Sequence, residues 1–116
     1  MASDSLPVAA LEQIALYFQA LSEPTRLHLL RLLRDSAEHS VGELAELIGT
    51  SPANASRHLS MLCQHGFVAR ESRGNAVYYR VADESVYEMC DVVCGHIARR
   101  LEALQRSYAP AVRRRA

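Results

Sequence analysis

The sequence predicts a mainly α-helical fold with one small β-hairpin. Three observations support this fold class. Apolar residues recur at spacings of three and four over most of the 116 residues, as they do along one face of a helix. Capping residues and glycines divide this pattern into about five segments. One stretch after residue 66 instead alternates around a Gly-Asn pair, which is typical of a hairpin.

The composition is that of one globular domain. A chain of 116 residues with 49% hydrophobic and 22% charged residues is long enough for one modest core. No run approaches the ~20 uninterrupted apolar residues of a membrane span, and the start has no basic segment followed by an apolar one. Three cysteines fit reduced thiols better than a disulfide framework. We therefore expect a soluble, cytoplasmic protein without a membrane partner.

Two helices are expected in the first third of the chain. The first runs from Pro7 to Leu21, because apolar residues recur there at helical spacing. We expect Ser22 to cap the second helix, with Pro24 in its first turn. The strongly apolar residues that follow, Leu30 among them, place this second helix in the core.

The middle of the chain predicts two short helices joined by a tight turn. Ser40 and Glu43 have the spacing of a capping box, and Gly49 ends the helix that they begin. Ser51 then caps a fourth helix that continues to Gly66. This arrangement matches the helix-turn-helix template, in which the second helix lies in the major groove of DNA.

The segment 67–81 predicts a β-hairpin after these helices. Gly74 and Asn75 supply the positive φ angles that a tight turn needs. Tyr78 and Tyr79 are adjacent, so one side chain faces inward and the other outward, and the pattern alone leaves open which. Such a hairpin is the wing of a winged helix-turn-helix fold, with about five helices and a two-stranded wing.

A long last helix is expected after Asp83. Its apolar stripe lasts about five turns and comprises Val86, Met89, Cys90, Val93, Ile97, Leu101 and Leu104. Because one small core cannot cover this stripe and that of the first helix as well, we expect a homodimer through the first and last helices. Residues 1–109 would form this DNA-binding and dimerisation domain, and 110–116 a basic, disordered tail.

The net charge of zero hides a gradient along the chain. Residues 1–50 carry three arginines and seven acids, whereas residues 51–80 carry four arginines and one glutamate, a net charge of +3. The basic excess thus coincides with the fourth helix and the hairpin, as expected for binding to phosphates. The overall neutrality favours only one alternative, a protein-interaction module without DNA binding. No nucleophile, base and phosphate-binding loop occur together, so we expect no enzyme.

Several segments, in order and spacing, resemble the ArsR family of repressors. The matching segments are Ala20-Leu21-Ser22-Glu23-Pro24-Thr25-Arg26-Leu27, Ser56-Arg57-His58-Leu59, Gly66-Phe67-Val68, Arg73-Gly74 and Val77-Tyr78-Tyr79. The resemblance covers roughly residues 10–82. It implies a dimer built from the first and last helices, a recognition helix that reads operator DNA with its N-terminal half, and release of DNA when an inducer binds.

The candidate DNA contacts are Ser51, Asn54, Ser56, Arg57, His58 and Arg73. Asn54 can read adenine, and Arg57 can read guanine or hold a phosphate. Ser51 and the free amides of the first turn can bind a phosphate, and Arg73 can reach the minor groove or its flanking phosphates. The alternatives are that Ser51 is only a cap, His58 a partly buried packing residue and Arg73 a solvated turn charge.

Cys90 and Cys94 lie four residues apart on the last helix, so their Cβ atoms are roughly 5 to 6 Å apart on one face. A direct disulfide needs about 3.8 Å, but a bridging atom would fit. Two thiolates suit a thiophilic inducer, most of all trivalent arsenic or antimony. The alternatives are two buried thiols that only pack, or redox thiols bridged by a polysulfide. Cys63 can be a third ligand only if the fold brings it to the last helix.

The chain departs from the family at two other sensor positions. Residues 42–47 lack the Cys-x-Cys pair that arsenic sensors of the family often carry in the third helix. The last helix offers only Asp91 and His96 in place of the histidine- and carboxylate-rich ligands of the zinc sensors. The sequence therefore favours a metalloid-released repressor over a zinc sensor, with a reactive-sulfur or redox sensor of the same fold as the rival.

Overall fold

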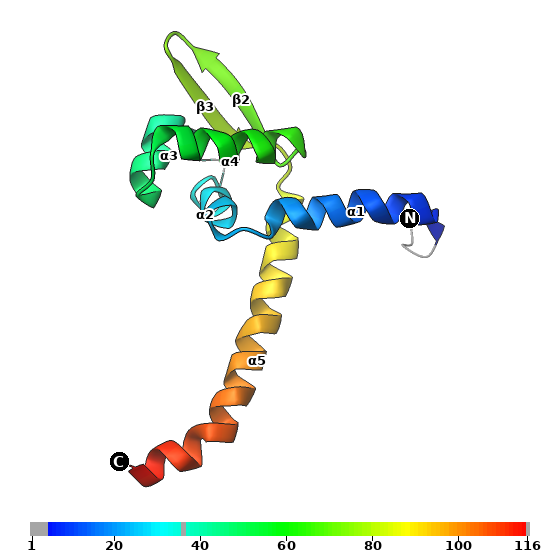
Figure 1. Cartoon of the computed structure of the whole chain (residues 1–116), viewed down its shortest axis with the longest axis vertical. Coiled ribbons are helices and arrows are strands. Elements are labelled where there is room, and N and C mark those ends of the chain that lie inside the picture. The colour runs from blue at the N-terminus through cyan, green and yellow to red at the C-terminus, as the bar shows by residue number, and fades with distance from the viewer. Residues whose placement is uncertain (1–4, 36, 116) are drawn as a thin grey trace. The chain divides into compact units, whose positions relative to one another are not determined.

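The computed structural model describes residues 5–35 and 37–115, with side chains up to residue 107. Its helices and strands are α1 (Val8–Leu21), α2 (Pro24–Leu32), β1 (His39–Ser40), α3 (Val41–Ile48), α4 (Pro52–Gln64), β2 (Val68–Arg73), β3 (Ala76–Val81) and α5 (Ser85–Arg115), as Figure 1 shows. The chain forms two compact units, one ending at Asp83 and one beginning at Glu84. Five helices and a small hairpin confirm the predicted fold class.

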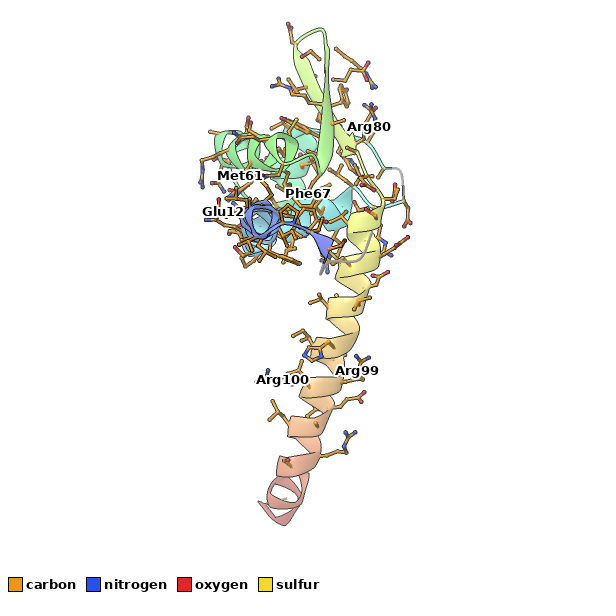
Figure 2. All side chains as sticks on the ribbon, turned by 90° about the vertical axis from the view of Figure 1, so that its right-hand side faces the viewer. Glu12, Met61, Phe67, Arg80, Arg99 and Arg100 are labelled. Carbon is orange, nitrogen blue, oxygen red and sulfur yellow. The ribbon has the colours of Figure 1, made fainter. Side chains whose placement is uncertain are left out.

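The core of the first unit lies where α2, α3 and α4 meet the base of the hairpin. The fully buried leucines are Leu29, Leu30, Leu33, Leu44, Leu59 and Leu62. Phe67, labelled in Figure 2, closes this core after α4, and its ring centroid lies 4.6 Å from that of Tyr17 on α1. Truncating one such leucine to alanine typically destabilises a fold by about 2–5 kcal/mol. This core therefore holds α4 and the hairpin in place.

The start of α2 differs from the prediction, because Glu23 and not Ser22 is its N-cap. A Glu23 carboxylate oxygen accepts a hydrogen bond from the backbone N–H of Arg26 at 3.1 Å. Ser22 instead ends α1, where its hydroxyl donates to the carbonyl of Gln19 at 2.7 Å. A carboxylate at this place also interacts favourably with the positive end of the helix dipole.

The predicted helix-turn-helix signals are confirmed at α3 and α4. The Ser40 hydroxyl accepts from the N–H of Glu43, and the Glu43 carboxylate accepts from the N–H of Ser40, both at 3.1 Å. Gly49 ends α3 with a φ of +75°, a conformation that costs glycine little. Ser51 then caps α4, since its hydroxyl accepts from the N–H of Asn54 at 3.1 Å.

The hairpin is antiparallel, with Val68 opposite Val81 and Arg73 opposite Ala76. Its turn differs from the prediction in one detail: Gly74 has a φ of +60°, but Asn75 is not among the described residues with positive φ. A glycine that alone takes positive φ at the first central position is the pattern of a type II′ turn.

The sheet has a third strand that the sequence did not predict. β1 pairs antiparallel with β3, with His39 opposite Tyr79 and Ser40 opposite Tyr78. Two residues are too few to show an alternating pattern, so no local signal marks this strand. The sheet also settles the orientation of the adjacent tyrosines: Tyr79 is 2% exposed and belongs to the core, whereas Tyr78 is half-buried.

The second unit consists of α5. Several of its apolar side chains are exposed: Val92, Val93, Ile97, Leu101 and Leu104. Arg99 and Arg100, labelled in Figure 2, are exposed on the same helix. The backbone remains helical through 110–115, where the sequence predicted an irregular tail, and the domain boundary at residue 109 stays a prediction. None of the helices in the described part of the chain combines the length and the apolar character needed to cross a membrane.

Candidate nucleic-acid interface

The N-terminal half of α4 divides into a buried and an outward face. Ala55, Leu59 and Leu62 are completely buried, which fixes the rotation of the helix. Asn54 is half-buried and Arg57 is exposed, so both have side-chain atoms at the surface. Helical periodicity thus separates these packing residues from Asn54 and Arg57.

Asn54 and Thr50 fix the beginning of this surface. The side-chain amide of Asn54 donates to the Thr50 hydroxyl at 2.9 Å. The other end of the same amide accepts from Nη2 of Arg57 at 2.7 Å. An amide group has two hydrogens and two lone pairs, so one of each remains for a base edge. Thr50 was not among the predicted site residues, although it orients one of them.

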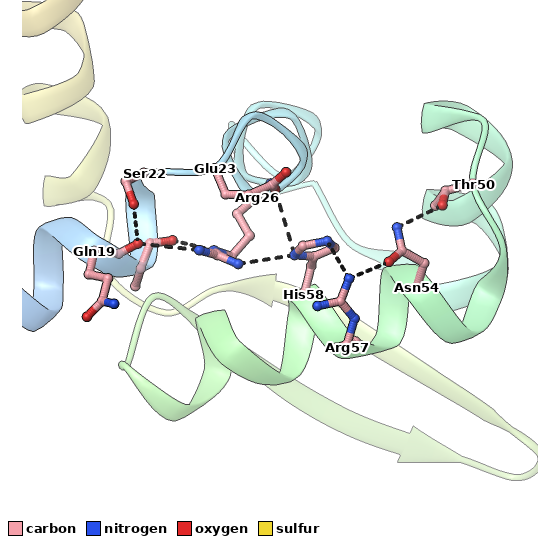
Figure 3. A network of polar contacts seen from close by, with 9 residues as sticks. Gln19, Ser22, Glu23, Arg26, Thr50, Asn54, Arg57 and His58 are labelled. Carbon is pink, nitrogen blue, oxygen red and sulfur yellow. Dashed lines mark hydrogen bonds and ion pairs between the residues drawn. The ribbon is translucent and has the colours of Figure 1, made fainter.

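Arg57 lies against two groups that carry no negative charge. Its Nη2 donates to Asn54 and lies 3.4 Å from Nε2 of His58, as Figure 3 shows. Among the described residues, its side chain makes these contacts through Nη2 alone, which leaves Nη1 and Nε for a ligand. The positive charge of Arg57 is therefore oriented by its neighbours but not neutralised by them.

His58 stands behind Arg57 and is only 5% exposed. Its Nδ1 lies 3.2 Å from Nη1 of Arg26 and 3.7 Å from a carboxylate oxygen of Glu23. Arg26 is itself held by the end of α1, since its Nε donates to the carbonyl of Ala20 at 2.6 Å. The placement of His58 fits the alternative reading of a packing residue better than that of a group facing a DNA groove.

The electrostatic environment of His58 favours its neutral form. Burial, as the largest cause, lowers the pKa of His58 below its ordinary value of 6.5. The positive charges of Arg57 and Arg26 lower the pKa further, and only Glu23 opposes them. The ring is therefore uncharged at neutral pH, with one of its two nitrogens free to accept a hydrogen bond.

Arg73, at the end of β2, has charged partners. Its two Nη atoms donate to the two oxygens of Glu38 at 2.6 and 2.9 Å, and Nη2 also donates to Glu71 at 2.8 Å. Its guanidinium carbon lies 4.7 Å from the ring centroid of Tyr78. The hydrogen bonds that Arg73 donates to Glu71 and Glu38 raise the pKa of Arg73, so its charge is permanent but is compensated by carboxylates. Arg73 is thus an exposed turn charge with ionic partners, and its contact with DNA stays a prediction.

The other two predicted DNA contacts are Ser51 and Ser56, both near the beginning of α4. Ser51 is exposed at the first turn of α4, where its hydroxyl serves as the N-cap. Ser56 is half-buried on the same helix, and no side-chain contact joins it to the other candidate residues within the described part. The structure thus brings Asn54, Arg57 and His58 together and leaves Arg73 on a separate element.

The three cysteines all lie within the described residues, and none forms a disulfide. Cys90 is half-buried and Cys94 exposed, one turn apart on α5. Cys63 is half-buried on α4, where it lines a pocket of about 330 Å³ together with Arg70 and Tyr79. Within the part of the chain that the structure describes, no three His, Cys, Asp or Glu side chains gather as a metal site. A third ligand in Cys63 stays a prediction.

A family model described as a helix-turn-helix domain matches residues 21–71, which include α2, α3 and α4. Among curated proteins, the chain is 35% identical over 78 residues to the CadC homolog of Staphylococcus aureus, a cadmium resistance transcriptional regulatory protein, covering 67% of this chain and 64% of that one. It is 33% identical over 89 residues to the "Probable mercury resistance operon repressor" of Streptomyces lividans, covering 77% and 70%. The match to the regulator YdfF of Bacillus subtilis is 36% identical and spans only 37% of YdfF.

Solved structures extend the likeness to the fold. The homodimeric winged helix-turn-helix DNA-binding domain of Mb0332 from Mycobacterium bovis, a possible ArsR-family transcriptional regulator, superimposes with a TM-score of 0.73 at 34% identity, over 89% of this chain and 95% of that one. The antimony-specific transcriptional repressor AntR gives a TM-score of 0.73 at 26% identity, over 88% and 92%. These relatives are regulators and not enzymes, as expected. The chain belongs to the ArsR family of winged helix-turn-helix transcriptional regulators.

Proposed function

We propose that this regulator is a repressor that binds a two-half-site operator as a homodimer and leaves it when trivalent arsenic or antimony binds Cys90 and Cys94. The observation that carries the sensing part is the pair of thiols one turn apart on α5, one half-buried and the other exposed. Such a repressor acts in the cytoplasm, where prokaryotic DNA lies.

The proposed DNA contacts follow from the geometry of α4 and the hairpin. Ser51 and the first-turn amides of α4 bind a phosphate, because helix N-termini attract anions. Asn54 and Arg57 read base edges, with Ser56 beside them. Arg73 binds a phosphate or the minor groove once DNA replaces its carboxylate partners. His58, being buried, supports Arg57 from behind.

Two exposed apolar surfaces support the homodimer. On α1, Val8 is 80% exposed, and Leu11 and Phe18 are about half exposed. On α5, Val93, Ile97 and the apolar residues that follow are exposed at helical spacing. Isolated exposed apolar side chains are ordinary, but contiguous stripes usually mark an interface. The homodimeric neighbour from Mycobacterium bovis adds support for pairing two copies of this chain.

The chemistry of the thiol pair supports a thiophilic inducer. Soft thiolate ligands select soft ions, and a trivalent metalloid needs only two or three sulfurs. The elements in the names of related proteins, cadmium, mercury and antimony, all belong to this chemical class. A coupling of ~1–3 kcal/mol per site, acting at two sites, would be enough to clear the operator.

The direct test is a fluorescence anisotropy titration of the DNA complex with arsenite, antimonite, cadmium, zinc and polysulfide. We expect arsenite or antimonite to weaken DNA binding of the wild-type protein by about fivefold or more. Cys90→Ser and Cys94→Ser should each abolish this release. Cys63→Ser tests the predicted third ligand, because release that survives this change limits the site to the pair on α5.

Two results would contradict the proposal. Unchanged release in both serine variants would remove the thiol pair from the mechanism. Release by polysulfide alone, with extra sulfur atoms retained in the mass of the protein, would identify the reactive-sulfur sensor instead.

A further inference from the structure

A buried histidine separates two arginines on the inner side of the recognition helix. Figure 3 shows the contacts running from the end of α1 through Arg26 and His58 to Arg57 and Asn54 on α4. The two guanidinium groups approach opposite nitrogens of the His58 ring, at 3.2 and 3.4 Å. These contacts link the surface expected to read DNA to Arg26, which lies 32 residues before His58 in the sequence.

The charge of the ring decides whether this arrangement is possible. Arginine can only donate hydrogen bonds. A neutral imidazole has one nitrogen that can accept a hydrogen bond, and its tautomer determines which nitrogen that is. A protonated imidazole has no acceptor at all. It would place three positive charges in a row, with the carboxylate of Glu23, 3.7 Å from Nδ1, as the compensating group.

The two arginines differ in how firmly they are held. Arg26 donates to the backbone carbonyls of Ala20 at 2.6 Å and Gln19 at 3.3 Å, so its position is fixed by the end of α1. Arg57 is exposed, and its only other partner among the described residues is the side chain of Asn54. When charge is added to the ring, Arg57 is therefore the group that moves.

We propose that His58 is a positioning residue whose neutral form, with Nε2 as the acceptor, holds Arg57 beside Asn54 for reading DNA, and whose protonation releases Arg57 and lowers sequence discrimination. This inference rests on the proposed reading of DNA by α4. Burial and the two arginines lower the pKa of His58, which places the change below pH 6.5. The charged groups that face the ring are Arg26 and Glu23 from the α2 side and Arg57 on its own helix.

The discriminating quantity is the ratio of affinities for a specific and a shuffled duplex. Protonation adds a positive charge near the phosphates, so the affinity for the shuffled duplex should not fall. The affinity for the specific duplex should fall, because a displaced Arg57 no longer reads its base. A purely structural role for His58 would lower both affinities together. The ratio therefore separates positioning from general destabilisation.

The experiment uses a duplex selected from a random-sequence library by the wild-type protein at pH 7.5, and its shuffled version. Fluorescence anisotropy at constant salt should show the affinity ratio falling by at least about fivefold as the pH is lowered stepwise from 7.5, through 6.5, to the lowest pH at which circular dichroism shows the protein folded. In His58→Gln, a neutral acceptor that does not titrate, the ratio should be independent of pH. The matched control His65→Gln, at the other end of α4, should behave as the wild type.

Two charge variants test the electrostatic cause. Glu23→Gln keeps an acceptor for the helix cap but removes the charge that raises the pKa of His58, so the midpoint of the pH change should move to lower pH. Arg26→Gln removes a charge that lowers this pKa, so the midpoint should move to higher pH. Thermal melting by circular dichroism confirms that each variant is folded.

The outcomes separate this inference from the proposed function. A wild-type ratio that stays constant with pH, or a His58→Gln profile like that of the wild type, overturns the positioning role while DNA reading by α4 stands. Midpoints that fail to move in opposite directions in the two charge variants also overturn it. Failure to select any duplex overturns the proposed function itself, and this inference with it.

Discussion

The N-terminal half of α4 and the tip of the hairpin each present an arginine expected to contact DNA. The two arginines have the same charge, but their electrostatic surroundings differ. Arg57 is held by an amide oxygen and a neutral ring, so its charge remains available to DNA. Arg73 is held by the carboxylates of Glu38 and Glu71, so its charge is already paired. The two arginines therefore carry the same formal charge, but Arg57 is more available than Arg73 to bind a phosphate or a base.

The difference suggests separate roles. An unpaired guanidinium gains the full attraction of DNA when it binds, whereas a paired one must first give up an existing ion pair. We therefore expect α4 to supply most of the affinity and discrimination. The hairpin should add a smaller and more salt-dependent contribution.

The largest effect is expected for Arg57→Ala. Loss of a base-reading arginine typically costs about 1–3 kcal/mol and relaxes specificity at one position of the site. Affinity for the selected duplex, measured by anisotropy, should fall accordingly. Arg31→Ala, an exposed arginine on α2, serves as the matched control. An effect of Arg57→Ala no larger than that of the control would remove Arg57 from the interface.

A smaller loss is expected for Arg73→Ala. Because the arginine must exchange Glu38 and Glu71 for a phosphate, its net contribution should be only about two- to fivefold in affinity at moderate salt. The slope of log affinity against log salt should decrease by about 0.9 for the one lost phosphate contact. A slope equal to that of the wild type would show that Arg73 stays with its carboxylates in the complex.

Glu38→Gln should act in the opposite direction. Removing the carboxylate that binds both Nη atoms of Arg73 leaves Glu71 as its one ionic partner within the described part of the chain, so DNA binding should tighten by about twofold. The salt dependence should stay close to that of the wild type, since Arg73 contacts the same phosphate in both proteins. Unchanged affinity in the same anisotropy assay would show that the ion pair does not compete with DNA.

The smallest effect is expected on the pH dependence of stability, and it concerns the buried His58 on α4. The lowered pKa of folded His58 means that the unfolded chain binds its proton more readily. The stability contributed by the neutral ring is thus present above pH 6.5 and is lost as pH falls through 6.5 toward the folded pKa. Melting temperatures measured from pH 7.5 to 5 should fall less steeply in His58→Gln than in the wild type, and parallel curves would contradict this.

Local signals were sufficient for the helices and the hairpin. The capping box of Ser40 and Glu43 and the positive φ of Gly49 are encoded within a few neighbouring residues, so the sequence predicts them directly. The cap of α2 was misassigned because Ser22 and Glu23 are adjacent and both can accept from a backbone N–H. Along α4, the buried apolar residues Ala55, Leu59 and Leu62 follow helical spacing, whereas the burial of His58 has no such local signal.

The partners of the site residues could not be predicted in the same way. Arg73 and Glu38 are 35 residues apart, and Arg26 and His58 are 32 apart, so only the folded chain brings them together. No periodicity or cap signal reports such contacts. They nevertheless decide the electrostatic difference between α4 and the wing, which the excess charge of residues 51–80 alone could not reveal.

The most direct test of the claim that α4 reads the sequence while the hairpin supplies general affinity is a comparison of discrimination in two variants. The ratio of affinities for the selected and shuffled duplexes is measured for Arg57→Ala and Arg73→Ala at the same pH and salt. We predict that Arg57→Ala lowers this ratio and that Arg73→Ala weakens binding to both duplexes while leaving the ratio unchanged. A ratio lowered by Arg73→Ala but not by Arg57→Ala would contradict the account.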